Sequence, residues 1–245
     1  MGGSVRYGII GDIHGNLDAL DAVLQVLEKE KVDRILCIGD IVGYGAEPLE
    51  CVNRLREKGI DSVAGNHDYA AAGTLDITYF NETAKEAIHW TREQLDDETI
   101  RYLTDLELVK TYETFVIVHS SLREPADFDY ILSWQDAQVS LDCLAEGKTC
   151  FFGHSHVPLS FLQGSNLLLT ADPVVDLRPF DKALINVGSV GQPRDQNPEA
   201  STVVYDEDAR TITRHRVPYD IDSAAAKIQE AGLPSVLGER LRVGQ

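Results

Sequence analysis

The sequence predicts an α/β fold, because short apolar runs typical of strands alternate with segments whose apolar residues recur at helical spacing. The opening part of the chain has the order strand, helix, strand, helix, strand, which is typical of a parallel sheet covered by helices. These five segments are residues 5–10, 17–30, 34–38, 47–58 and 60–64. Farther along, residues 201–217 contain two β-rich runs around an Asp-Glu-Asp-Ala turn, which predicts a C-terminal β-hairpin.

Local signals support both helices in this opening part. Asn16 precedes residues 17–30 and is well suited to cap the first turn with its side-chain oxygen. Pro48 lies in the first turn of the segment 47–58, and a glycine follows the end of that segment. Proline inside the start and glycine just past the end is the usual arrangement for a helix.

The middle of the chain continues the same alternation. Residues 81–106 are predicted to be helical in one or two pieces, with Asn81 as the cap and a break at Asp96-Asp97. A further helix is expected over residues 133–146. Strands are expected at residues 114–118, 149–152, 166–170 and 183–187. Neither an internal repeat nor a low-complexity linker is evident, so residues 1–245 are interpreted as one domain.

Composition and charge exclude several classes of protein. With 22 basic and 40 acidic residues, the chain carries a net charge of −18. Such a surface repels nucleic acid, whose binding depends on lysine and arginine, so a nuclease is disfavoured except for short single strands. No apolar run is long enough to span a membrane, and the N-terminus lacks the apolar core of a signal peptide. A cytoplasmic protein with reduced cysteines is therefore expected.

Residues able to bind metals recur where the predicted strands end. Strand ends in an open α/β sheet converge on one crevice, so these residues are expected to meet there. In extended chain, residues i and i+2 point to the same side, which favours joint action of each Asp-x-His or His-x-His pair. The stretches are Asp12-Ile13-His14, Gly39-Asp40, Gly65-Asn66-His67-Asp68, His119 and Gly153-His154-Ser155-His156.

The chemistry of this set points to divalent cations. Carboxylate, amide and imidazole ligands without a thiolate suit Mn, Fe, Zn, Co or Ni, and they argue against a structural zinc site of the cysteine type. Seven ligands are too many for one tetrahedral ion, but they suit two ions that share a carboxylate. Any one histidine beside a glycine is more often a turn residue, and His89 and His215 are interpreted as ordinary helix and hairpin residues.

In their order and spacing these stretches resemble the calcineurin-like metallophosphoesterases, whose pattern is D-x-H, G-D, G-N-H-[DE], H and G-H-x-H. The resemblance covers Asp12 to His156, and the branch it is most similar to contains bacterial phosphodiesterases related to diadenosine tetraphosphate hydrolases. It implies a four-layer αββα sandwich, in which two mixed β-sheets are flanked by helices. It also implies two divalent metal ions and a metal-bridging water as the nucleophile.

The resemblance implies a role for each matching residue. The first metal would be held by Asp12, His14 and His156, and Asp40 would bridge to the second. His67 would act as general acid or as a donor to the phosphoryl oxygens, with Asp68 orienting it. The remaining ligands, which would hold the second metal, are Asn66, His119 and His154.

The sequence departs from the serine/threonine phosphatase branch of this family. That branch has a phosphate-binding arginine shortly after its G-D, and residues 41–45 contain none. Ser120 follows His119 where many relatives have glycine. Arg123 and Arg194 both follow predicted strand ends and are candidate substitutes, since arginine binds phosphate through two parallel hydrogen bonds. For each of them, a surface ion pair is an equally good interpretation.

The leading hypothesis is a phosphoesterase that acts on a small soluble phosphoester or nucleotide, as a phosphodiesterase or a phosphatase. The missing arginine makes a phosphoprotein substrate less favoured. The alternative is a non-catalytic, metal-binding interaction module of the same fold. Retention of every ligand position and of His67 argues against that alternative.

Overall fold

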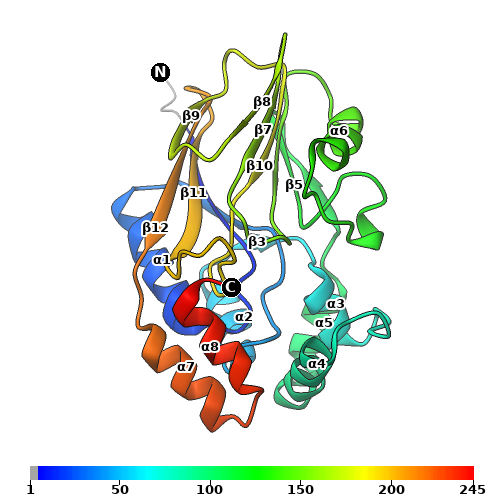
Figure 1. Ribbon diagram of the computed structural model, residues 1–245, viewed down its shortest axis with the longest axis vertical. Helices are drawn as coiled ribbons and strands as arrows, with labels where there is room; N and C mark the ends of the chain where they lie inside the picture. The colour runs from blue at the N-terminus through cyan, green and yellow to red at the C-terminus, as the bar shows by residue number, and fades with distance from the viewer. Residues whose placement is uncertain (1–4) are drawn as a thin grey trace.

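The computed structural model describes residues 5–245, which form two β-sheets stacked face to face with helices on both outer sides (Figure 1). Each sheet has six strands within this part of the chain. The order is β3-β2-β1-β11-β12-β9 in the first sheet and β4-β5-β6-β10-β7-β8 in the second. Both sheets are mixed, and the predicted sandwich of two mixed sheets between helices is confirmed.

The strands are short. Those of the first sheet are β1 (Arg6–Ile10), β2 (Arg34–Cys37), β3 (Asp61–Ser62), β9 (Val174–Asp176), β11 (Ala200–Asp206) and β12 (Thr211–Val217). Those of the second sheet are β4 (Val109–Thr111), β5 (Phe115–Val118), β6 (Thr149–Phe152), β7 (Ser160–Gln163), β8 (Leu167–Thr170) and β10 (Lys182–Asn186).

The helices lie outside the two sheets and below them in the view of Figure 1. They are α1 (Leu17–Lys29), α2 (Pro48–Glu57), α3 (Asn66–Ala72), α4 (Glu82–Gln94), α5 (Asp97–Thr104), α6 (Trp134–Cys143), α7 (Ile221–Glu230), α8 (Ser235–Val243) and the 3-10 turn η1 (Pro125–Asp127). Within residues 5–245 none of them combines the length and the apolarity that crossing a membrane requires.

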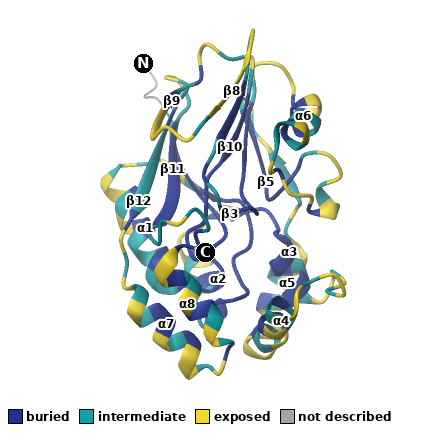
Figure 2. Ribbon diagram, in the orientation of Figure 1, coloured by how far each residue is buried: buried dark blue, intermediate teal, exposed yellow. Residues whose placement is uncertain are grey.

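Side-chain alternation along the strands creates three apolar layers. Along β6, Phe151 points between the sheets and packs in a cluster with Phe115 and Tyr205. Its neighbours Cys150 and Phe152 point the other way and pack against α6. A third cluster fills the space between the first sheet and helices α1 and α2. The central strands β5, β6 and β11 are buried on both faces, whereas β8 and β9 are largely exposed (Figure 2).

The direction of the strands places one end of both sheets at a common site. In the first sheet β1, β2 and β3 run parallel, and in the second β5, β6 and β10 run parallel. Their carboxyl ends therefore gather at one edge of the sandwich, where ligands bind in folds of this type. Loops leaving β1, β2, β3, β5 and β6 carry the seven predicted metal ligands, and the loop after β10 carries Arg194.

Most predicted elements are present with small shifts at their ends. The break expected at Asp96-Asp97 is confirmed, because the Asp96 side chain caps α5 by accepting the Thr99 N–H. The predicted hairpin is β11 and β12, and it joins the first sheet through antiparallel pairing of β11 with β1. The strands β4, β7 and β9 were not predicted from the sequence, and neither were α3, which carries Asn66, His67 and Asp68, nor α7 and α8, which follow the hairpin.

Candidate metal centre

Four buried side chains form the first cluster of potential metal ligands. Each of Asp12, His14, Asp40 and His156 offers one donor atom, and these atoms all lie within 4.8 Å of one another. The Nε2 atoms of His14 and His156 are 3.1 Å apart. Asp12 Oδ1 lies 3.3 Å from His156 Nε2, and Asp40 Oδ2 lies 3.5 Å from His14 Nε2. Three β-strands, β1, β2 and β6, thus deliver one compact set of donors.

A second cluster shares Asp40 with the first. It contains Asp40, His119 and His154, again with donor atoms within 4.8 Å of one another. His119 Nε2 lies 3.4 Å from Asp40 Oδ2 and 3.0 Å from His154 Nδ1. The side-chain oxygen of Asn66 is 3.2 Å from the same His119 nitrogen. The seven residues predicted as ligands therefore lie together, with Asp40 between the two groups.

Backbone carbonyls orient three of the histidines. Nδ1 of His14 lies 3.1 Å from the Val42 carbonyl oxygen, and Nδ1 of His156 lies 2.6 Å from that of Gln192. Nδ1 of His119 lies 2.9 Å from the Ile38 carbonyl oxygen. A carbonyl oxygen can only accept, so each Nδ1 carries a proton. In the neutral rings of His14 and His156, Nε2 then directs a lone pair into the cluster. Against the effect of burial, the Asp40 carboxylate raises the pKa of His119 to about 9 when no cation is bound. Carbonyl oxygens that accept from Nδ1 commonly hold metal-binding histidines in this orientation.

The lone pairs and negative charges inside these clusters suit a bound cation. Burial lowers the pKa of His14 and of His156 well below the usual histidine value, so both rings are neutral. Their two Nε2 lone pairs then face each other at 3.1 Å, which is repulsive unless a positive ion lies nearby. Burial raises the pKa of Asp12 to about 6, and the negative charge of Asp40 adds to this effect although His119 opposes it. A divalent cation at each cluster supplies opposite charge.

The backbone at the centre is strained. Asp12, His14, Asp40, His154 and His156 all have left-handed φ values between 49° and 64°. Residues other than glycine rarely adopt this conformation, and each instance costs about 1–3 kcal/mol. Five such residues in one centre indicate that the surrounding fold holds the side chains in a geometry that the local chain does not prefer. Such strain concentrates at functional sites.

Two glycines let the backbone approach the carboxylates. A Cβ atom on Gly65 would lie 2.0 Å from Oδ1 of Asp40, and one on Gly153 would lie 2.2 Å from Oδ2 of Asp12. Neither distance is possible between real atoms. The glycines of the G-N-H-D and G-H-x-H stretches therefore give the two aspartates the room they occupy.

Replacing Gly153 with alanine is expected to displace Asp12 and to destabilise the protein by about 1–3 kcal/mol, the usual cost of overpacking. Metal content, measured by elemental analysis, should fall together with the melting temperature. Gly164→Ala is the matched control, because the nearest atom to its Cβ would be 3.3 Å away. Unchanged metal content in Gly153→Ala would show that metal binding does not depend on the present position of Asp12.

His67 lies beside the clusters at the start of α3. Its backbone N–H donates to Oδ1 of Asp40 at 2.9 Å, and its ring lies 4.9 Å from that of His14. Tyr44 and Phe80 pack against the ring with centroid distances of 4.4 and 5.3 Å. Nδ1 of His67 has no hydrogen-bond partner among the described residues. Burial lowers the pKa of His67 to about 4, so the ring is neutral without a bound anion.

The prediction that Asp68 orients His67 is wrong. One oxygen of Asp68 accepts the backbone N–H groups of Ile41 and Val42 at 2.8 and 3.2 Å, and the other accepts that of Gly65 at 2.9 Å. With three backbone donors, Asp68 fixes the loop after Asp40 against α3. It thus positions the carbonyl of Val42, which orients His14.

The two candidate arginines lie in different surroundings. Arg194 follows β10, contacts the side-chain oxygen of Gln192 at 2.7 Å and lies 5.8 Å from the ring centre of Tyr44. Its side chain also interacts with Tyr130. Burial is the main cause of the lowered pKa of His67, and the positive charge of Arg194 contributes to the same shift. Arg123 is exposed and lines a separate hollow with Asp129 and Asp136. Only Arg194 therefore lies at the centre.

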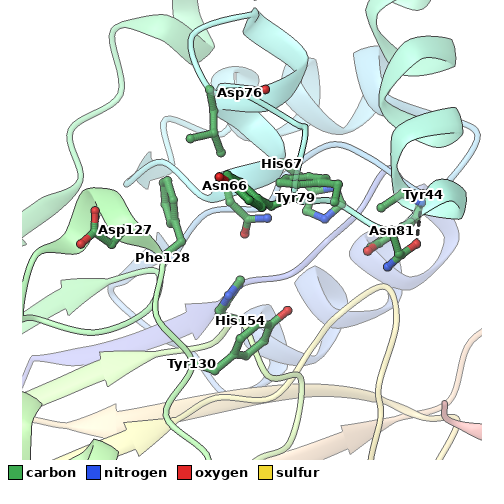
Figure 3. Close-up of a pocket in the computed structure, with 13 residues that line it drawn as sticks. Tyr44, Asn66, His67, Asp76, Tyr79, Asn81, Asp127, Phe128, Tyr130 and His154 are labelled. Atoms are coloured by element: carbon green, nitrogen blue, oxygen red, sulfur yellow. Dashed lines mark hydrogen bonds between the residues drawn. The ribbon is translucent and has the colours of Figure 1, made fainter.

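A cleft of about 340 Å³ opens next to the second cluster (Figure 3). Asn66 and His154 line it, as do His67 and Tyr44. Tyr130 lines it as well and stacks on His154, with ring centroids 3.9 Å apart. The cleft gives a bound molecule direct access to the metal-binding donors.

Known proteins similar to this chain have the same fold and belong to a metal-dependent family. The calcineurin-like phosphoesterase superfamily domain matches residues 5–210, and the chain belongs to this family. A crystallised metallophosphoesterase from Sphaerobacter thermophilus is 39% identical and superposes with a TM-score of 0.88 over 99% of this chain and 100% of its own. Uncharacterized protein MJ0912 from Methanocaldococcus jannaschii is 39% identical over 242 residues, 97% of each chain.

A more distant relative has a specific name. The symmetrical bis(5'-nucleosyl)-tetraphosphatase of Mannheimia succiniciproducens is 29% identical over 156 residues, which are 58% of this chain and 52% of that protein. The family is metal-dependent, and the two clusters are its candidate metal-binding residues here.

The carbonyl groups and aromatic side chains that surround the ligands were not predicted from the sequence. The carbonyls of Ile38, Val42 and Gln192 orient histidines, but a carbonyl has no signature in sequence. Tyr130 and Phe128 were not singled out either, although two aromatics in an otherwise polar loop near His119 are a usable signal.

Proposed function

We propose that this protein is a phosphoester hydrolase that uses two divalent cations. The observation that carries the proposal is the pair of buried donor clusters that share Asp40. Asp12, His14 and His156 would hold the first cation, with Asp40 between the two. The residues that would complete the second site are Asn66, His119 and His154.

The donor set supports both the kind of ion and the kind of reaction. Carboxylates, an amide oxygen and imidazoles without thiolate suit Mn, Fe, Zn, Co or Ni. Two such ions, when bound, polarise phosphoryl oxygens and acidify water at neutral pH. The protein residues around them exclude bulk solvent, because all seven donors are buried. Electrostatic effects are strong in such a site.

His67 is proposed to hydrogen-bond to the phosphoryl group or to protonate the leaving oxygen. Its ring borders both the clusters and the cleft, which places it beside any ester bound there. Tyr44 and Phe80 hold the ring from two sides. Asp68 acts on the same site indirectly by fixing the loop after Asp40.

The proposed substrate is a small soluble phosphoester, and a nucleotide is the favoured class. Relatives named symmetrical bis(5'-nucleosyl)-tetraphosphatase support this choice. The net charge of −18 disfavours long nucleic acids. A cytoplasmic location stays a prediction from the sequence.

Arg194 is proposed to bind a phosphate oxygen of the substrate. Arg194→Ala should raise KM by about 10–100-fold, because a hydrogen bond to a charged group contributes about 1.5–3 kcal/mol. Arg194→Lys should recover only part of this loss, since lysine lacks the two-pronged geometry. Arg123→Ala is the control and should leave steady-state kinetics unchanged. Equal effects at both positions would remove the proposed role of Arg194.

The activity is tested with bis-p-nitrophenyl phosphate and p-nitrophenyl phosphate in the presence of added Mn²⁺. Hydrolysis that EDTA abolishes and Mn²⁺ restores is expected. Faster turnover of the diester would identify a phosphodiesterase, and faster turnover of the monoester a phosphatase. Inactivity with every one of Mn²⁺, Zn²⁺, Co²⁺ and Ni²⁺ would instead favour the non-catalytic module.

A further inference from the structure

The walls of the cleft beside the second cluster are unusually aromatic. Besides Tyr44, they include Tyr79, Phe80, Phe128 and Tyr130. Figure 3 shows Phe128 and Asp127 on one side of the cleft and Tyr44 and Asn81 on the other. The loop before α4 and the loop after η1 thus contribute facing groups of side chains.

Two of the aromatics differ sharply in how they are held. Phe128 is 7% exposed, has a left-handed φ of 53° and makes an edge contact with Tyr69 at 6.2 Å. Tyr79 is 95% exposed, although it lines the cleft. A fixed ring on one wall and a free ring at the mouth are suited to enclose a planar ligand between them, since stacking is favourable for any flat π-system.

The charge of the cleft selects against a phosphate. Asp76 and Asp127 line it, whereas no lysine or arginine does so among the described residues. Thr78 donates to Asp76 from its N–H and its hydroxyl, at 2.9 and 2.6 Å, which lowers the pKa of Asp76 and keeps it ionised. Carboxylates repel anions, but they accept hydrogen bonds from amino groups. The cleft therefore suits an uncharged ring with N–H donors.

Positive charge lies elsewhere around the centre. Arg194 is on the β10 side, against Tyr44 and Gln192, and does not line the cleft. A substrate with its phosphorus at the clusters would thus meet the aromatic and acidic lining of the cleft at Asp76 and Asp127, and the Arg194 guanidinium beside Tyr44 and Tyr130. These two groups of residues distinguish the organic end of the substrate from its phosphate end.

We propose that this cleft binds the nucleobase of a nucleoside phosphoester. The base lies between Phe128 and Tyr79, the reacting phosphorus lies at the clusters, and further phosphates extend toward Arg194. The inference rests on the proposed hydrolysis at the metal centre and adds the site that recognises the organic group. Asp76 and Asp127 accept hydrogen bonds from the base or its sugar.

The test is calorimetric titration of the Mn²⁺-loaded protein with adenosine and with ribose, neither of which contains an ester to hydrolyse. Adenosine should bind at least about tenfold more tightly than ribose, as expected for one stacked base. Tyr79→Ala should remove most of this difference, and its high exposure means that the variant should fold normally. Phe128→Ala is the second variant. Leu132→Ala, which truncates a side chain that is 69% exposed outside the cleft, is the control.

Hydrolysis of bis-p-nitrophenyl phosphate by the same samples separates the two proposals. Equal binding of adenosine and ribose, or a preference unaffected by Tyr79→Ala and Phe128→Ala, would overturn the nucleobase site. If hydrolysis persisted in that case, the proposed function would stand without it. A base preference that depends on Tyr79 and Phe128 in a protein without hydrolysis would support the cleft and contradict the proposed function.

Discussion

Replacing Asp40 with asparagine is expected to lower turnover by about 10³-fold or more and to reduce the metal content at both clusters. Asp40 is the one carboxylate common to the two groups, at 3.5 Å from His14 and 3.4 Å from His119. The amide has the same shape but lacks the negative charge, and so attracts a cation less strongly. Loss of the ions removes several kcal/mol of transition-state stabilisation, and each 1.36 kcal/mol is tenfold in rate.

The measurement pairs steady-state kinetics with elemental analysis of the purified variant. Asp61→Asn is the matched control, since Asp61 is half-exposed and pairs only with Arg34 and Lys110 among the described residues. That control should retain both activity and metal. Asp40→Asn with a full complement of ions would show that the clusters do not share this carboxylate.

His67→Ala is expected to slow turnover by about 10²–10⁴-fold, the usual contribution of a positioned proton donor. Metal content should stay unchanged, because the His67 ring is not among the donors of either cluster. This variant therefore tests the chemical step alone, whereas Asp40→Asn is expected to affect both turnover and metal binding.

His89→Ala serves as the matched histidine control, because His89 lies exposed on α4. Its kinetics and metal content should equal those of the unaltered protein. Should the metals be lost from His67→Ala, His67 would be a ligand, and its assignment as a donor to substrate would have to be abandoned.

The convergence of the ligands followed from simple rules of chain geometry. Parallel strands end at one edge, and Asp12, Asp40, His119 and His154 each follow such a strand. The polar type of each residue then indicated a metal. Local sequence therefore carried enough information to bring the candidate ligands to one edge of the sandwich, whereas their division between two metals came from the resemblance to the family.

Features that depend on tertiary contacts could not be predicted in this way. The role of Asp68 is an example, because its neighbour His67 suggested a pair, whereas three backbone N–H groups from two loops compete for its oxygens. Strand β9 is another, since its three residues are a strand only through pairing with β12. Helix α7 is different, because Ile221, Ala224, Ala225 and Ile228 recur at helical spacing and Asp220 caps its start. The local signal for this helix was therefore present in the sequence although the helix was not predicted.

The location of bound metal tests the central claim most directly. Crystals grown with Mn²⁺ should show two anomalous-scattering peaks roughly 3.5–4 Å apart, the usual separation in two-metal sites. One peak should contact Asp12, His14 and His156, the other should contact Asn66, His119 and His154, and both should contact Asp40. A single peak, or peaks that lie away from Asp40, would contradict the two-cation centre.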